Sequence, residues 1–251
     1  MDIGTAKPLI QEQAGITHHL LDIVEPGEKF SVAEFQKRAK KCVQEIDSRG
    51  NVPILVGGTG LYVDSVLYNF HFPKTVDDMR RQTIEQMSDD ELTTLMLSKN
   101  IDITTLNTKN RRHVVNAILR DGKVGTREPL LPNARIVGLR LERDVLQTRI
   151  TQRVDEMFEQ GFLAEVQQLA ERYGWDNEAM SGIGYRVARQ YFEGGASEEE
   201  AKAAFIQRDL SLAKRQRTWF RRNEDIGWFD DPKDLIDNAI EFVSAFDYNK
   251  N

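Results

Sequence analysis

Hydrophobic and polar residues alternate along the N-terminal part of the chain in a way that predicts helices between short buried strands. Ser31 followed by Glu34 predicts a capping box at a helix start, and Gly50 marks the end of that helix. The elements predicted here are a strand at 17–23, a helix at 31–49, a strand at 52–57 and a helix at about 61–68. Because such alternation is typical of a parallel sheet, the pattern predicts an α/β fold.

The pattern changes after this region, where polar helical segments follow one another without a strand as far as Gly122. This change predicts a helical insertion in the α/β domain. The expected organisation is a first part of the α/β core at 1–71, the insertion at 72–122, and the rest of the core with C-terminal helices at 123–251.

Helical patterns dominate the last part of the chain. Ser197 followed by Glu200 predicts a second capping box, and glycines mark several helix ends. The elements predicted here are a strand at 134–141, helices at 143–159, 162–173, 184–193 and 197–222, a strand at 226–229 and a helix at 231–246.

The segment VPILVGGTGLY at 52–62 joins the second predicted strand to a helix through Gly57, Gly58, Thr59 and Gly60. Glycines let the backbone approach a ligand, free N–H groups at a helix start attract anions, and a threonine hydroxyl can donate to a phosphate. The segment therefore predicts a phosphate-binding turn. The alternative is an ordinary turn between strand and helix, in which the Thr59 hydroxyl only caps the helix.

Composition narrows the class of protein. The chain has 251 residues, 40% of them hydrophobic, and a single cysteine, Cys42, so it can bury a sizeable core and is no disulfide scaffold. Asp2 follows Met1 without a basic and apolar leader, and no run of about 18 apolar residues occurs. We therefore expect a cytoplasmic protein without a signal peptide or membrane span.

The net charge is −6, yet one predicted helix is strongly basic. Residues 208–222 contain six bases and one acid, Asp209. Projected on a helix, one half of the circle holds Arg208, Lys214, Arg215, Arg217, Arg221 and Arg222, and the other half holds Phe205, Leu212, Trp219 and Phe220. Such a face attracts phosphates, although a solvated amphipathic helix is the alternative interpretation.

Six motifs in order resemble the tRNA dimethylallyltransferases. They are MDIGTAKP at 1–8, THHLLDI at 17–23, FSVAEFQ at 30–36, VGGTGLY at 56–62, GIGYR at 182–186 and AKRQRTWFRR at 213–222. The resemblance implies transfer of a dimethylallyl group from dimethylallyl diphosphate to N6 of the adenosine 3′ of the anticodon in tRNA, with Mg²⁺ assisting. It also implies a sheet like that of the P-loop NTPases, and a monomer that binds the tRNA anticodon stem-loop and no membrane.

The resemblance also implies parts that this chain does not contain. The family begins with a strand, a phosphate-binding loop G-x-x-x-x-G-K-[ST] and a strand ending in a catalytic aspartate, all upstream of MDIGTAKP. Here the Gly122–Lys123 pair is followed by valine, and Ala117 stands where the first glycine of the loop belongs. A late start or a fragment would explain missing N-terminal strands, and the chain as given is expected to be impaired in prenyl transfer.

Two other functions compete with this interpretation. A non-catalytic tRNA-binding fragment or paralogue would bind tRNA without prenylating it. A transferase acting on free adenylate would need neither the helical insertion nor the basic helix, so both features argue against it.

The resemblance assigns roles to individual residues. Thr59 is the expected catalytic residue, and Gly57, Gly58 and Arg186 are expected to bind the diphosphate. For Arg186, an ion pair with an acid of a neighbouring helix is an equally weighted alternative. No metal ligand is predicted, and His18 and His19 are expected to be structural. The residues expected to contact tRNA are Arg81, Arg112, His113, Asn116, Lys214, Arg215, Arg217 and Arg221.

The chain departs from the family pattern at three of these places. Ser181 replaces a basic residue that helps to bind the diphosphate, and Asn116 replaces an arginine. The pair Asp209–Leu210 replaces a threonine–arginine pair. Around Asn116, the apolar residues Val114, Val115, Ile118 and Leu119 are expected to belong to a core.

Overall fold

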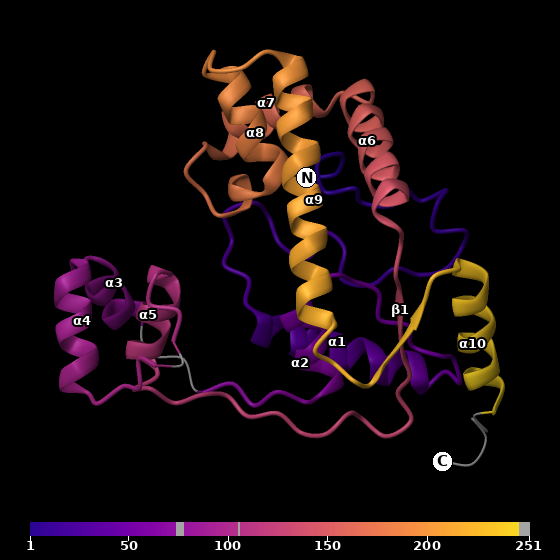
Figure 1. Cartoon of the computed structure of the whole chain (residues 1–251), viewed down its shortest axis with the longest axis horizontal. Helices are drawn as coiled ribbons and strands as arrows, with labels where there is room; N and C mark the ends of the chain where they lie inside the picture. The colour runs from indigo at the N-terminus through magenta and orange to yellow at the C-terminus, as the bar shows by residue number, and fades with distance from the viewer. Residues whose placement is uncertain (74–77, 105, 246–251) are drawn as a thin grey trace. The chain divides into compact units, whose positions relative to one another are not determined.

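The computed structural model describes residues 1–73, 78–104 and 106–245 (Figure 1). The chain forms two compact units, one made of Met1–Val63 with Pro132–Asn251 and the other of Asp64–Leu131. The division into segments at 1–71, 72–122 and 123–251 stays a prediction.

Four helices form the core of the first unit. They are α6 (Arg143–Glu159), α7 (Phe162–Tyr173), α8 (Ile183–Phe192) and α9 (Glu198–Phe220). Phe162 is fully buried at their centre, with its ring 5.6 Å from that of Phe205 and 5.9 Å from that of Tyr185. Gly161 joins α6 to α7 with a φ of 96°, a left-handed conformation that suits glycine because it lacks a Cβ. The predicted bounds of α6 and α7 are confirmed.

Helix α9 is the longest helix among the described residues, and its charges suit its direction. Ser197 and Glu200 form the predicted capping box, with the Ser197 N–H donating to the Glu200 carboxylate at 2.8 Å. Three glutamates occupy the first turn, and basic residues gather near the other end. Both ends therefore complement the helix dipole.

Two strands, β1 (Ile136–Leu139) and β2 (Ile226–Phe229), pair in parallel in the first unit, as Ile136 opposite Ile226 through Leu139 opposite Phe229. The 3₁₀ turn Ala179–Ser181 precedes α8, and α10 (Pro232–Ala245) follows β2. The predicted α/β class is confirmed by this parallel pairing between helices. Within the described residues the protein is mostly helical.

The strands predicted at 17–23 and 52–57 are wrong. Neither range contains a strand, and Ile54 and Val56 are 79% and 87% exposed. A strand needs a neighbour to complete its backbone hydrogen bonds. In the described part of the chain the two strands present pair with each other, so no partner lies beside these apolar runs.

Helix α1 (Val32–Asp47) starts at the predicted residue, but its capping box is incomplete. The Ser31 hydroxyl accepts a hydrogen bond from the Glu34 N–H at 3.2 Å. The Glu34 carboxylate accepts from the Arg38 guanidinium at 2.7 Å instead of reaching back to Ser31. A salt bridge one turn along the helix has replaced the second half of the box.

The second unit contains α3 (Asp78–Glu85), α4 (Asp89–Ser98) and α5 (Arg111–Leu119). Helix α2 (Gly60–Leu67) begins in the first unit and continues into the second. These three helices and the segment after α4 form one hydrophobic core cluster, whose buried residues are Ile84, Leu92, Met96, Ile101, Val114, Val115, Ile118 and Leu119. The predicted core role of the apolar residues of α5 is confirmed.

Candidate active site

Thr59 lies at the start of α2, on the loop Gly57–Gly60. Its carbonyl oxygen accepts from the N–H groups of Tyr62 at 3.0 Å and Val63 at 3.1 Å, which fixes the first turn of the helix. Its exposed side-chain hydroxyl has no hydrogen-bond partner among the described residues. A contact of this hydroxyl with a ligand stays a prediction, as does its alternative role as a helix cap.

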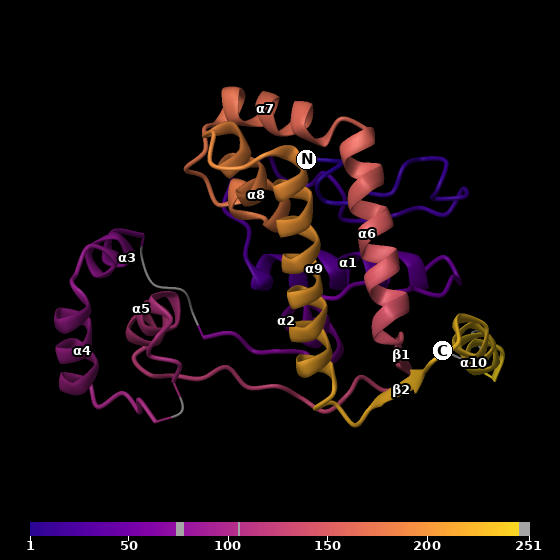
Figure 2. The same ribbon diagram turned by 45° about the horizontal axis from the view of Figure 1, so that its top comes forward.

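The loop lies against the C-terminal half of α9. A Cβ on Gly58 would be 2.3 Å from the Gln216 Nε2 atom, and a Cβ on Gly60 would be 2.2 Å from the Trp219 Cδ1 atom. Two glycines therefore allow the backbone on both sides of Thr59 to approach the helix. In both views the start of α2 lies beside this half of α9 (Figures 1 and 2).

The same half of α9 carries positive charge that the described residues leave unneutralised. Several arginines elsewhere pair with carboxylates, as Arg38 does with Glu34 at 2.7 Å. On α9, five exposed cations form no such pair within the described part of the chain, and they are Lys214, Arg215, Arg217, Arg221 and Arg222. A cavity of about 240 Å³ is lined by Lys214, Arg215, Thr218, Trp219 and Arg222. This side of α9 therefore suits a phosphate-bearing ligand.

The structure changes the predicted two-sided pattern of α9 in two places. Trp219 is 44% exposed and does not belong to the buried side. Asp209 is buried, and its carboxylate accepts from the Arg153 guanidinium of α6 at 2.5 Å. This ion pair gives Asp209 a structural role in place of the threonine of the family pattern. The unpaired basic surface begins at Lys214.

Arg186 is exposed on α8 and has no ion-pair partner among the described residues. Pairing with an acid of a neighbouring helix, which was the alternative to diphosphate binding, does not occur there. Its neighbour Tyr185 is buried below the N-terminal segment, where its ring and that of Phe162 leave no room for a Cβ on Gly4. Diphosphate binding by Arg186 stays a prediction.

The N-terminal motif is held by one carboxylate. Glu165 accepts from the N–H groups of Asp2 at 2.6 Å, Ile3 at 2.8 Å and Gly4 at 3.0 Å, and from the Tyr185 hydroxyl at 2.9 Å. Burial alone would raise the pKa of Glu165, but these four hydrogen bonds outweigh it and lower the pKa. Glu165 is therefore ionised and fixes the motif to α7 and α8.

A lysine links the first two motifs of the sequence. The Lys7 ammonium lies 2.5 Å from the Asp2 carboxylate and 2.8 Å from that of Asp22. The hydrogen bond from Lys7 is the main cause of the lowered pKa of Asp2. A lowered pKa makes Asp2 a weaker proton acceptor.

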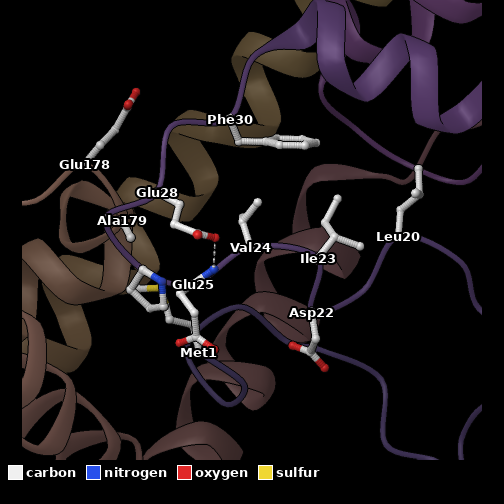
Figure 3. Close-up of a pocket in the computed structure, with 12 residues that line it drawn as sticks. Met1, Leu20, Asp22, Ile23, Val24, Glu25, Glu28, Phe30, Glu178 and Ala179 are labelled. Carbon is white, nitrogen blue, oxygen red and sulfur yellow. Dashed lines mark hydrogen bonds between the residues drawn. The ribbon is translucent and has the colours of Figure 1, made fainter.

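A second cavity in the first unit has the wrong charge for a diphosphate. It encloses about 350 Å³ next to the segment Leu20–Phe30 (Figure 3). Its apolar wall includes Ile23 and Val24, while the acidic side chains around it are Asp22, Glu25, Glu28 and Glu178. Carboxylates repel a diphosphate, so the loop beside α9 is the better candidate for the anion.

The second unit brings together two of the residues predicted to contact tRNA. The Arg81 guanidinium donates to the Asn116 side-chain oxygen at 3.2 Å and to the Glu85 carboxylate at 3.2 Å. Arg112 and His113 are exposed on the first turn of α5. Burial, with help from the nearby charge of Arg81, lowers the pKa of Arg120.

Arg111, the neighbour of Arg112, has a structural role instead. Its guanidinium pairs with Asp89 and donates to the carbonyl oxygens of Glu85 and Met87. These contacts tie the start of α5 to the segment between α3 and α4. These contacts disfavour a phosphate contact by Arg111.

Two further expectations concern metals and membranes. In the described ranges no group of three or more acids, histidines or cysteines could hold a metal ion, and the Mg²⁺ that the resemblance implies stays a prediction. His18 makes a local contact of 2.9 Å with the carbonyl oxygen of Ile16. No described helix is long and apolar enough to cross a membrane.

Sequence reasoning missed Gln216 and Trp219 as partners of the loop and left Arg222, which it placed on the basic face, out of the residues expected to contact tRNA. The two loop contacts become visible only in three dimensions. The available sequence signal was that Gln216 and Trp219 are three residues apart, which places their side chains on one face of a helix.

Comparison with known proteins identifies the family. The family model described as IPP transferase matches residues 1–223. The tRNA dimethylallyltransferase of Anoxybacillus flavithermus is 42% identical over 249 residues, covering 94% of this chain and 79% of the relative. That of Oceanobacillus iheyensis is 37% identical, covering 97% and 82%. The chain belongs to the IPP transferase family, as its motifs predicted.

Solved structures agree with this assignment. The full-length tRNA isopentenylpyrophosphate transferase of Bacillus halodurans aligns with a TM-score of 0.70 and 35% identity, covering 98% of this chain and 83% of that one. A eukaryotic dimethylallyltransferase acting on tRNA aligns with a TM-score of 0.80 and 23% identity, covering 99% and 71%. At that identity the second likeness concerns the fold alone.

Proposed function

We propose that this protein is a prenyltransferase that moves a dimethylallyl group from dimethylallyl diphosphate to tRNA, at N6 of the adenosine 3′ of the anticodon. The observation that carries the proposal is the placement of the Thr59 loop beside the unneutralised cations of α9, in a chain of the IPP transferase family. A hydroxyl for the leaving group and a surface for nucleic acid thus meet at one place.

The reaction exchanges one bond at the first carbon of the dimethylallyl group. The N6 lone pair of adenine forms a bond to this carbon, the bond from carbon to the diphosphate oxygen breaks, and N6 gives up a proton to solvent water. The Thr59 hydroxyl donates to the departing oxygen, on which negative charge grows. Gly57 and Gly58 let the diphosphate approach the backbone, and Arg186 supplies a further positive charge.

The tRNA is held by two sets of residues in this proposal. Lys214, Arg215, Arg217 and Arg221 contact its phosphates. Arg81, Arg112, His113 and Asn116 of the second unit contact the anticodon stem-loop. The target base leaves its stack to reach the hydroxyl, which costs a few kcal/mol and least in a single-stranded loop. We expect a monomer that acts where tRNA is found, in the cytoplasm.

Labelled dimethylallyl diphosphate and unmodified tRNA test the proposal. With the protein in excess over tRNA, even slow transfer gives labelled tRNA, and tRNA carrying guanosine 3′ of the anticodon should stay unlabelled. Binding of tRNA without any label would favour the non-catalytic tRNA-binding alternative. If the protein neither binds tRNA nor labels it, the proposal is overturned.

A further inference from the structure

The loop that carries Thr59 is fitted to two side chains of α9. Gly58 contacts the amide end of Gln216, and Gly60 contacts the indole of Trp219. A Cβ at either glycine would lie within 2.3 Å of these side chains, whereas real Cβ atoms essentially never come within 3.0 Å of such atoms. Each glycine is therefore matched to one partner.

The residues before the loop give it little support. The residues before it form no strand, and the side chains of Ile54 and Val56 are almost fully exposed. Trp219 is itself 44% exposed, so its indole does not fill the core of the helices but lies against Gly60. The position of Thr59 is therefore set by the first turn of α2, whose N–H groups bond to the Thr59 carbonyl, and by the contacts of its two neighbouring glycines with α9.

The two partners and the basic residues are on the same part of one helix. Gln216 and Trp219 are three residues apart, which places them on one face of α9. Lys214 and Arg215 line the same cavity as Trp219. One rigid element therefore connects the phosphate-binding surface to the loop.

We propose that Gln216 and Trp219 are positioning residues for Thr59, so that the helix that binds tRNA also sets the place of the catalytic hydroxyl. This inference rests on the proposed function. It assigns to the two side chains a part in the rate of prenyl transfer that is separate from tRNA affinity. A shift of about 1 Å in a reacting group is enough to cost about 100-fold in rate.

The test introduces a steric clash with a methyl group at Gly60 and then removes the clash with a smaller side chain at position 219. Gly60→Ala should lower the single-turnover rate of prenyl transfer about 10- to 100-fold, with the tRNA Kd within about twofold of the unchanged protein. Adding Trp219→Leu should restore part of that rate, because the smaller side chain makes room for the new methyl group. Gly58→Ala should cost less rate than Gly60→Ala, because the flexible end of the Gln216 side chain can move away from the new methyl group.

Two controls separate positioning from folding and from packing. Gly195→Ala is a matched control, because its Cβ would have its nearest neighbour, a backbone oxygen, at 3.4 Å. Its rate and melting temperature should be unchanged. Gln216→Met keeps the length of the side chain without the amide and should retain more rate than Gln216→Ala.

Three results would overturn the inference. They are an unchanged rate in Gly60→Ala, a double variant as slow as the product of the two single effects, or equal loss of tRNA affinity and rate. The last result would make Trp219 a direct RNA contact, for instance a surface on which a base stacks. If the unchanged protein transfers no prenyl group, the proposed function has failed instead of the positioning role.

Discussion

Removing one cation from α9 should change the salt dependence of tRNA binding by a predictable amount. The side chains of Lys214, Arg215, Arg217 and Arg221 are exposed and unpaired within the described residues, so each can release a counterion on binding a phosphate. At about 0.7 to 0.9 per contact, four contacts give a log–log slope of about −2.8 to −3.6. Raising the salt fourfold should then weaken binding about 50- to 150-fold.

Arg215→Ala should remove one phosphate contact and make the log–log slope shallower by about 0.7 to 0.9. The same fourfold rise in salt should then weaken binding about 20- to 40-fold. Filter binding or fluorescence anisotropy with tRNA at several salt concentrations measures both slopes. Arg38→Gln is the matched control, because the Arg38 guanidinium is already paired with Glu34. A slope that is the same in Arg215→Ala and in the unchanged protein would refute the assignment of α9 to tRNA phosphates.

Three other substitutions test the chemistry and the fold. Thr59→Ala should lower the rate of prenyl transfer about 10-fold or more with tRNA affinity unchanged, and an equal loss of affinity would contradict a role in the chemical step. Phe162→Ala should lower the free energy of unfolding by about 3 to 5 kcal/mol in urea titrations, because it empties the centre of the helical core; a loss below about 1 kcal/mol would place the core elsewhere. Glu165 has a lowered pKa, so its stabilising effect is complete at neutral pH and is lost as the pH falls below 4.5, its ordinary pKa. Glu165→Gln should therefore be less stable than the unchanged protein at pH 7 and lose less stability on acidification, and parallel pH profiles would contradict this.

Sequence reasoning located the helices well because their signals are local. The bounds of α6 and of β2 follow from periodicity and from nearby glycines, which act within a few residues. The strand predicted at 52–57 failed because burial of a strand depends on partners far away in the chain. An apolar run reports what a segment would prefer to bury and not whether a neighbour is present.

In the candidate site, too, local patterns predicted some residues, while contacts between distant residues could not be predicted. Thr59 and the basic residues of α9 stood out by residue type and by resemblance. The pairing of Asp209 with Arg153, 56 residues apart, could not be predicted, since no local pattern joins them. The fit of Gly60 to Trp219 depends on the same kind of distant contact. Because of this contact, the exposed indole of Trp219 belongs to the candidate site, although the helical projection of the sequence had placed Trp219 on the buried side.

The position of the modified base is the most direct test of the central claim. Unmodified tRNA is incubated with excess protein and dimethylallyl diphosphate, digested with a nuclease, and its fragments are analysed by mass spectrometry. The account predicts a dimethylallyl group on N6 of the adenosine 3′ of the anticodon and nowhere else, with far less of it in Thr59→Ala. Bound tRNA whose adenosines all remain unmodified, or product that is equal in Thr59→Ala, would contradict it.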